Sequence, residues 1–196
     1  MQKDIENKKR IAIIGVRGYP YSYGGYETFV RELVERLVLE NIEITVYCHR
    51  KLFLNRPSLL NGIKLVYIPS IETKLLSQFI HSLLSTIHAC FTNSNILLYV
   101  NSANGPFAII AKLFNKKTII NVDGLEWKRP KWNGLGKKYF YISSKLACKI
   151  FDYIVTDAEE MRKIYLHEFN KDSQVITYGA NINKSIKPDL IRQYGI

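Results

Sequence analysis

Cysteine, methionine and tryptophan are scarce in this 196-residue sequence, with three, two and two copies. Cys48, Cys90 and Cys148 are odd in number, lie far apart in the chain and have no metal-ligand spacing. This pattern argues against a disulfide framework and favours reduced thiols in a cytoplasmic protein. The four histidines form no zinc or catalytic-triad pattern either, so we expect no bound metal ion and no cofactor.

Long apolar runs are absent as well. Residues 1–10 are polar and charged, and the apolar run that follows is too short for a signal-peptide core or a membrane span. The most apolar helical stretch, 75–91, is interrupted by polar and histidine side chains. We therefore expect a cytoplasmic protein, unless it binds a membrane from the side.

Acidic residues are few, with 17 against 28 basic ones, and the formal net charge is +11. The excess is concentrated in residues 112–149, where ten basic residues accompany only Asp123 and Glu126. A concentrated basic surface indicates an anionic partner, such as nucleic acid, anionic lipid headgroups or a phosphorylated substrate. A merely solvated surface is the alternative.

Short apolar runs alternate with amphipathic stretches along most of the chain. We expect strands at 11–14, 42–48, 62–69, 96–100, 118–122, 153–156 and 174–176, and helices near 29–38, 75–91, 106–114, 134–151 and 158–169. This order is typical of an α/β fold with a doubly wound, mostly parallel, Rossmann-like sheet and helices on both faces. We expect one such domain over 1–180 and a connector over 181–196.

A glycine-rich loop separates the first strand from the first helix. It contains Gly15, Arg17, Gly18, Gly24 and Gly25. Glycines at this position allow an anion to approach the unpaired N–H groups of a helix N-terminus, so the loop predicts a phosphate site. A long connection without a ligand is the alternative.

The loop lacks the signatures of two common nucleotide sites. It is neither G-x-G-x-x-G nor G-x-x-x-x-G-K-[ST], and the second strand ends at Cys48-His49 where a dinucleotide site needs an acidic residue. A nicotinamide cofactor and an NTPase loop are therefore disfavoured. The loops at 48–50, 101–105 and 123–129 also follow strands and are polar or glycine-rich, so we expect them to share one site with the glycine loop.

Three groups of segments together carry a resemblance to a known family. They are 14–18 with 23–30, then 122–129, then 156–160 with 177–180. The combination resembles the N-terminal domain of family-four retaining glycosyltransferases, in the bacterial rhamnosyltransferase-like subgroup. The resemblance implies one half of a GT-B architecture, in which this half holds the acceptor and a missing C-terminal domain holds the nucleotide-sugar. The Glu160 and Glu168 pair matches the family's Glu-x7-Glu donor spacing, but we interpret it as a solvated helix face.

The resemblance also implies roles for individual residues. Gly15, Arg17, Gly18, Gly24 and Gly25 would approach the donor diphosphate. Asp123 stands where many relatives have a histidine and would act as a base or accept a sugar hydroxyl, with a structural turn role as the alternative. The residues expected near the acceptor are Asn101, Ser102, Glu126, Trp127, Lys128 and Arg129, where a sugar could stack on the indole and a diphosphate could meet cations.

The helix expected over 134–151 has two distinct sides. We expect Leu135, Tyr139, Ile142, Leu146 and Ile150 to pack on the core. The opposite side carries Lys137, Lys138, Lys145 and Lys149 and would face an anionic membrane. This suits a lipid-diphosphate-linked acceptor, and it would equally suit RNA.

The resemblance thus implies the acceptor-binding domain of a hexosyltransferase of capsule or cell-wall polysaccharide synthesis, cytoplasmic and peripheral on the inner face of a bacterial plasma membrane. By the subgroup, the enzyme would transfer rhamnose or another hexose from a nucleotide-sugar, dTDP-rhamnose, to a lipid-linked saccharide, and this domain alone would be inactive. The alternatives are a non-catalytic lipid- or phosphosugar-binding module that acts with a separate donor-domain chain, a basic Rossmann-like nucleic-acid-binding protein, and a sugar-nucleotide epimerase. Nucleic acid is the disfavoured partner.

Overall fold

The computed structural model describes residues 9–21, 24–71 and 76–179. Its strands are β1 (Arg10–Ile14), β2 (Glu43–His49), β3 (Leu59–Leu60), β4 (Ile63–Ile68), β5 (Ile96–Val100), β6 (Lys117–Val122), β7 (Tyr153–Thr156) and β8 (Gln174–Val175). Its α-helices are α1 (Gly25–Leu39), α2 (Leu76–Cys90), α3 (Ala108–Leu113), α4 (Gly134–Ile150) and α5 (Glu159–Phe169). Three 3-10 helices, η1 (Arg50–Leu52), η2 (Ser102–Phe107) and η3 (Glu126–Lys128), follow β2, β5 and β6.

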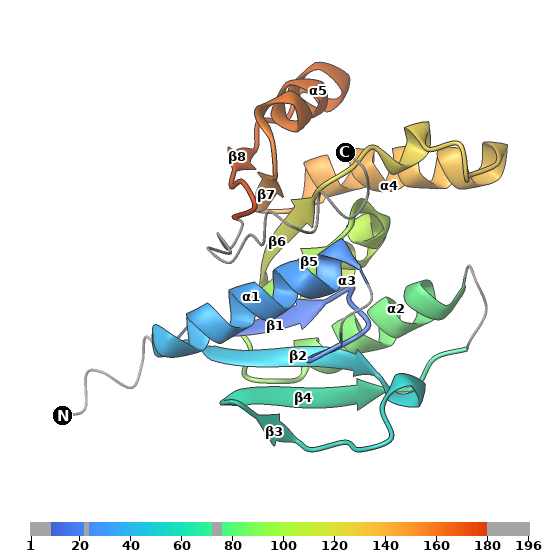
Figure 1. Cartoon of the computed structure of the whole chain (residues 1–196). Helices are drawn as coiled ribbons and strands as arrows, with labels where there is room; N and C mark the ends of the chain where they lie inside the picture. The colour runs from blue at the N-terminus through green and yellow to red at the C-terminus, as the bar shows by residue number, and fades with distance from the viewer. Residues whose placement is uncertain (1–8, 22–23, 72–75, 180–196) are drawn as a thin grey trace, which may run out of the picture.

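The strands form one sheet in the order β3-β4-β2-β1-β5-β6-β7-β8 (Figure 1). Every strand pair is parallel except β3 with β4, which confirms the predicted α/β class and the mostly parallel sheet. The sequence did not predict β3, because two residues are too few to show a period-two pattern. The predicted connector over 181–196 lies outside the described residues.

The helix expected over 106–114 is divided in the structure. The side-chain oxygen of Asn101 accepts a hydrogen bond from the Ala103 backbone N–H at 2.8 Å and caps η2. The chain therefore turns helical directly after β5, and α3 continues from η2 at Ala108. Pro106 lies within this helical segment rather than at its start.

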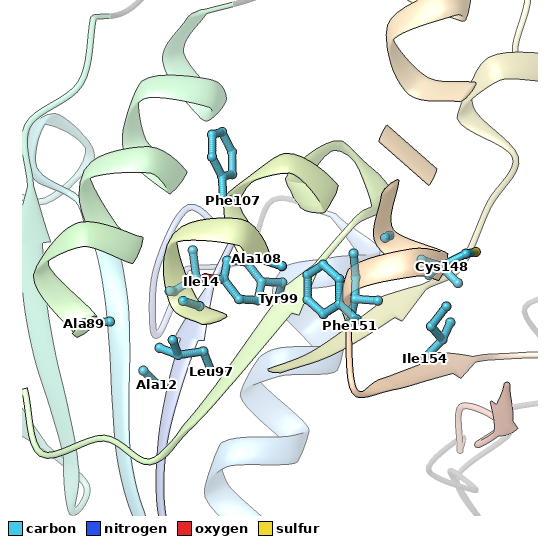
Figure 2. Close-up of a cluster of buried hydrophobic side chains, with 14 of the residues drawn as sticks. Ala12, Ile14, Ala89, Leu97, Tyr99, Phe107, Ala108, Cys148, Phe151 and Ile154 are labelled. Carbon is cyan, nitrogen blue, oxygen red and sulfur yellow. The ribbon is translucent and has the colours of Figure 1, made fainter. Parts of the chain in front are cut away.

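The sheet separates two hydrophobic clusters. Side chains alternate along β1, so Ile13 belongs to the cluster under α1, whereas Ala12 and Ile14 belong to the cluster under α2 to α5. Figure 2 shows the second cluster, in which the Tyr99 and Phe151 rings meet edge to face at 5.3 Å. The helices therefore cover both faces, with α1 on one and α2 to α5 on the other.

Helix α4 has nearly the predicted bounds but buries a different side. The prediction that Leu135 and Ile142 pack on the core is wrong, because these side chains are 81% and 45% exposed. The buried side consists of Phe140, Ser143, Ser144, Ala147 and Cys148. Small side chains are needed there because α4 lies directly against η2, where the Ser143 hydroxyl donates to the Ser102 carbonyl oxygen at 2.5 Å.

Two buried histidines stack at the end of β2. The rings of His49 and His81, the latter on α2, lie 3.7 Å apart between centroids and are nearly parallel. Burial, together with the neighbouring His49, lowers the pKa of His81 to about 3 from an ordinary value of 6.5. His81 is therefore neutral in the folded protein at neutral pH.

This lowered pKa predicts a loss of stability in mild acid. Between these two pKa values the unfolded chain binds a proton at His81 that the folded chain does not, so stability falls as the pH falls. From about pH 7 to about pH 5 the free energy of unfolding should fall by about 2 kcal/mol, since one pKa unit corresponds to about 1.36 kcal/mol. Urea unfolding at both pH values should show a smaller loss for His81→Gln than for His167→Gln, a control on the exposed side of α5. Equal losses in the two variants would contradict the prediction.

Candidate functional site

Gly15 lies where the chain order of the sheet reverses. Strands β2 and β5 flank β1 on opposite sides, so the crevice between the ends of β1 and β5 is the expected ligand position of this topology. Gly15 has φ +101°, and a Cβ there would lie 2.5 Å from both the Val100 carbonyl oxygen and Asn104 Nδ2. Glycine is required here both for the backbone conformation and for the close approach to the β5 end.

Gly18 and Arg17 hold the following part of the loop against β2. Gly18 has φ +139°, and a Cβ there would lie 2.7 Å from the Phe53 ring and 2.9 Å from Cys48 Cβ. The Arg17 carbonyl oxygen accepts a hydrogen bond from the His49 backbone N–H at 2.9 Å. Both residues therefore shape the loop through backbone geometry.

Gly24 and Gly25 form an open helix N-terminus. Gly24 is the N-cap of α1 and, as a glycine, has no side chain to cap the helix, and both glycines are exposed. A Cβ on Gly25 would meet no described atom within 4 Å. The first N–H groups of a helix have no partner within it, so this end can receive an anion. The buried Glu27 carboxylate accepts the Arg17 backbone N–H at 3.4 Å and ties the first turn of α1 to the loop.

Asp123, directly after β6, lies against the first turn of α1. The Tyr26 hydroxyl, in that turn, donates a hydrogen bond to the Asp123 carboxylate. Tyr178, which follows β8, donates to Asp123 Oδ2 at 3.5 Å and to Asn121 Oδ1 at 3.1 Å, and its ring lies 5.0 Å from that of Phe29 on α1. The structure therefore brings the glycine-loop helix and the β6 loop together, as the sequence led us to expect.

The carboxylate of Asp157 adds negative charge near Asp123. Burial raises the pKa of Asp123, and the nearby Asp157, directly after β7, raises it further. The hydrogen bond from Tyr26 and the charge of Arg129 act in the opposite direction. Within the described residues, Asp123 Oδ1 and Asp157 Oδ1 are buried without a hydrogen-bond partner. Two such oxygens can accept hydroxyl donors from a bound molecule.

Asn101 and Ser102 serve the local fold. Asn101 has φ +77°, and its side chain caps η2. Ser102 is 2% exposed, beneath the surface beside α4. Neither side chain is placed in the open part of the crevice by these contacts.

The loop from Glu126 to Arg129 is held together by ion pairs. Glu126 is buried and binds Arg129 Nε at 3.0 Å, Lys131 Nζ at 3.4 Å and the Trp132 indole N–H at 2.9 Å. Lys128 is exposed. The carboxylate thus holds Arg129, whose guanidinium lies near Gly124 and acts on Asp123, and it also pairs with Lys131.

Trp127 lies in the core. It is 8% exposed, and its indole meets the rings of Tyr141, Tyr165 and Phe169 at 5.6 to 6.0 Å. These contacts leave no face for a stacked sugar, so we do not propose that role. The four lysines predicted to face a membrane, Lys137, Lys138, Lys145 and Lys149, are all exposed on α4.

Tyr26, Tyr178 and Asp157 are the site residues that the sequence interpretation missed. Asp157 follows β7 as Asp123 follows β6, so the rule on strand ends could have identified it. Tyr26 and Tyr178 occur within the segments that carry the family resemblance, but no spacing in the sequence links either to Asp123. No group of three or more potential metal ligands occurs in the part of the chain that the structure describes.

A hollow of about 350 Å³ opens at the opposite edge of the sheet, away from these residues. It lies beside the first residues of β1 and β2 and is lined by Arg10, Glu43, Thr45, Lys64, Val66, Phe91, Thr92, Asn93 and Ser94. The Arg10 and Lys64 cations in it are paired with Glu43 at 3.6 and 3.7 Å. We therefore place the candidate site at the carboxyl edge.

Solved structures of glycosyltransferases share this fold. Sucrose-phosphate synthase from Thermosynechococcus elongatus matches 96% of this chain with a TM-score of 0.69 and 15% identity. Anabaena Alr3699/HepE in complex with UDP and glucose matches 96% with a TM-score of 0.61 and 11% identity. Arabidopsis thaliana UGT89C1 complexed with UDP-L-rhamnose matches 96% with a TM-score of 0.52 and 13% identity.

The chain spans about half of each of these proteins, 53%, 50% and 54% of their lengths. The matches confirm that the domain has the glycosyltransferase-like fold of one GT-B half, as the resemblance implied. No curated protein matches the sequence. Residues 8–181 match the family described as Domain of unknown function (DUF1972), and the chain belongs to that family.

Proposed function

We propose that this chain is the acceptor-side domain of a sugar transferase that uses a nucleotide-sugar donor. One observation carries the proposal: Tyr26 in the first turn of α1 contacts Asp123, so an open helix N-terminus and a carboxylate with a free oxygen lie side by side. The first suits a diphosphate and the second suits a sugar hydroxyl.

The chemistry follows from the charge that develops during transfer. Cleavage of the glycosidic bond leaves negative charge on the donor diphosphate, which the amides at Gly24 and Gly25 would stabilise. Asp123 would accept a hydrogen bond or a proton from the reacting hydroxyl. A donor-binding domain would bring the nucleotide-sugar to this edge, either within a longer protein or as a second chain.

The finer identity of the substrates is part of the proposal. We propose rhamnose or another hexose as the transferred sugar, from dTDP-rhamnose or a related donor, and a lipid-linked saccharide of capsule or cell-wall synthesis as the acceptor. UGT89C1, one half of which has this fold, was solved with UDP-L-rhamnose, so rhamnosyl donors are the first to test. Retention of configuration remains an expectation from the family resemblance.

Transfer of labelled rhamnose from dTDP-rhamnose to a short-chain lipid-diphosphate-linked saccharide tests the proposal. The assay should include the donor-binding domain, in the longer protein or added as a second chain. Nucleotide-glucose and UDP-linked sugar donors should be run for comparison. Transfer from any of them supports a sugar transferase, and the preferred donor identifies the sugar. Acceptor binding without transfer from any donor would support the phosphosugar-binding module instead.

Gly25→Ala separates a functional glycine from a structural one. Because a Cβ meets no described atom and alanine favours helix, stability should stay the same or rise slightly. The methyl group would stand at the open helix end, so transfer should fall about tenfold or more, or about 1.4 kcal/mol. Kinetics and thermal unfolding of the same preparation check both parts, with Gly134→Ala at the start of α4 as the matched control. Unchanged transfer by Gly25→Ala would contradict the phosphate role.

A further inference from the structure

Helix α2 has its polar side chains toward the sheet and apolar side chains toward the outside. Its sheet-facing side is small and largely polar, with His81, Ser82, Ser85, Thr86, Ala89 and Cys90 buried. Its outer side exposes apolar residues, with Phe79, Leu84 and Ile87 each 38 to 39% exposed and Phe91, just beyond its end, 75% exposed. A helix that covers a sheet normally buries its apolar stripe. The outer side of α2 therefore has the composition of a buried surface.

The polar inner side has partners within the fold. The Thr86 hydroxyl donates to the Ser82 carbonyl oxygen at 2.8 Å, and the Tyr99 hydroxyl on β5 donates to Thr86 at 3.1 Å. The Tyr99 bond, together with that between the Tyr47 hydroxyl on β2 and His88 Nδ1 at 2.9 Å, ties α2 to the sheet and fixes its rotation about its axis. The exposed apolar side is therefore a stable feature of the fold.

The apolar surface continues onto α3 and reaches α4. The exposed Phe91 ring lies 5.0 Å from that of Phe114, and the neighbouring Leu113 is 77% exposed. Phe79 lies 6.4 Å from the ring of Tyr139 on α4. Beyond it, α4 exposes Leu135 and Ile142, interspersed with its lysines. We call the outer sides of α2, α3 and α4 the docking face.

The docking face carries an excess of positive charge on α4, and the Asp152 carboxylate that follows α4 is paired with Lys112 on α3. No acidic residue occurs between Glu72 and Asp123 or between Glu126 and Asp152, and these two stretches contain all three helices. In the described residues, Lys138, Lys145 and Lys149 make no ion pair. Exposed apolar side chains beside unpaired cations match the boundary between anionic headgroups and acyl chains.

We propose that the docking face binds the surface of an anionic lipid bilayer, with the apolar side chains of α2 and α3 entering the headgroup region. A second copy of the chain fits less well, because two such faces would repel each other through their lysines. RNA fits less well because most of the α2 surface offers no cation to a phosphate. No helix among the described residues is long and apolar enough to span a bilayer. The proposal goes beyond sugar transfer and is tested without donor or acceptor.

Cosedimentation with phosphatidylcholine vesicles, with and without phosphatidylglycerol, tests the proposal. The chain should bind the anionic vesicles, and added salt should weaken binding. Changing Lys138, Lys145 and Lys149 together to Gln should weaken it roughly 100-fold at low salt, at about 1 kcal/mol per cation. The matched control changes Lys9, Lys51 and Lys163 to Gln, three exposed lysines outside the docking face.

The apolar contribution has its own pair of variants. Ile87→Asn with Phe91→Asn should weaken vesicle binding about tenfold. Leu39→Asn with Leu54→Asn, at positions 83% and 98% exposed elsewhere, should leave it unchanged. Circular dichroism of each variant checks folding.

Three results would overturn the proposal. One is no binding to anionic vesicles at low salt. Another is a concentration-dependent dimer, seen by sedimentation velocity, that the Ile87 and Phe91 changes abolish. The third is that the chain retains RNA at matched salt and that the triple lysine variant loses RNA binding but still binds vesicles. Because no sugar is present, none of these results bears on whether the domain takes part in sugar transfer.

Discussion

Gly15→Ala is expected to lower the midpoint of thermal unfolding by roughly 6 to 12 °C, which corresponds to about 3 kcal/mol or more. Two costs combine. Alanine is strained at φ +101°, and its Cβ would overlap the Val100 carbonyl oxygen and Asn104 Nδ2 at 2.5 Å. Neither neighbour can yield easily, because Val100 is in a central strand and Asn104 Nδ2 itself binds the Val100 carbonyl oxygen at 2.5 Å.

The outcome distinguishes the two ends of the glycine loop. Differential scanning fluorimetry of Gly15→Ala, with Gly25→Ala as the matched control, compares a glycine fixed by packing with one in open space. A shift of less than about 2 °C for Gly15→Ala would mean that the β1 and β5 ends separate at little cost, contrary to the geometry of the crevice. Larger loss in Gly25→Ala than in Gly15→Ala would reverse the assignment of the two glycines.

Local sequence signals predicted the sheet well. Residues 96–100 and 153–156 have the predicted bounds because short β-rich runs are ended there by polar or turn residues. Gly62 marks the turn before β4 for the same reason. The position of Asp123 at a strand end followed from the strand predicted over 118–122. In these places a residue's own chemistry and its nearest neighbours decide the structure.

Long-range packing was less accessible from the sequence. The apolar residues of α4 suggested a core face, but the close approach to η2 requires Ser143 and Ala147 there and turns Leu135 outward. The contact of Tyr26 with Asp123 joins residues nearly 100 positions apart, and it depends on where α1 begins relative to β6. Sequence periodicity records which residues could be buried, whereas the partner helix decides which ones are.

Asp123→Asn is expected to reduce sugar transfer by about 100-fold to 1000-fold, within the range for loss of a positioned base. The substitution keeps the shape of the side chain and removes its ability to take a proton. Burial and Asp157 already disfavour the charged form of Asp123 in the fold, so the neutral amide should leave stability unchanged or raise it at about pH 7. A purely structural turn residue would give the opposite pattern, with lost stability and normal transfer.

The neighbouring carboxylate of Asp157 allows the role of Asp123 to be tested through its pKa. Asp157→Asn should lower the raised pKa of Asp123, because it removes a neighbouring negative charge. The acidic limb of the transfer-rate profile should therefore move to lower pH, while the rate at about pH 7 changes less than in Asp123→Asn. Asp172→Asn, at an exposed carboxylate paired with Arg162, is the control and should leave the profile unchanged. If Asp123→Asn transfers sugar at a near-normal rate, or if the acidic limb stays in place in Asp157→Asn, Asp123 is not the group that takes the proton.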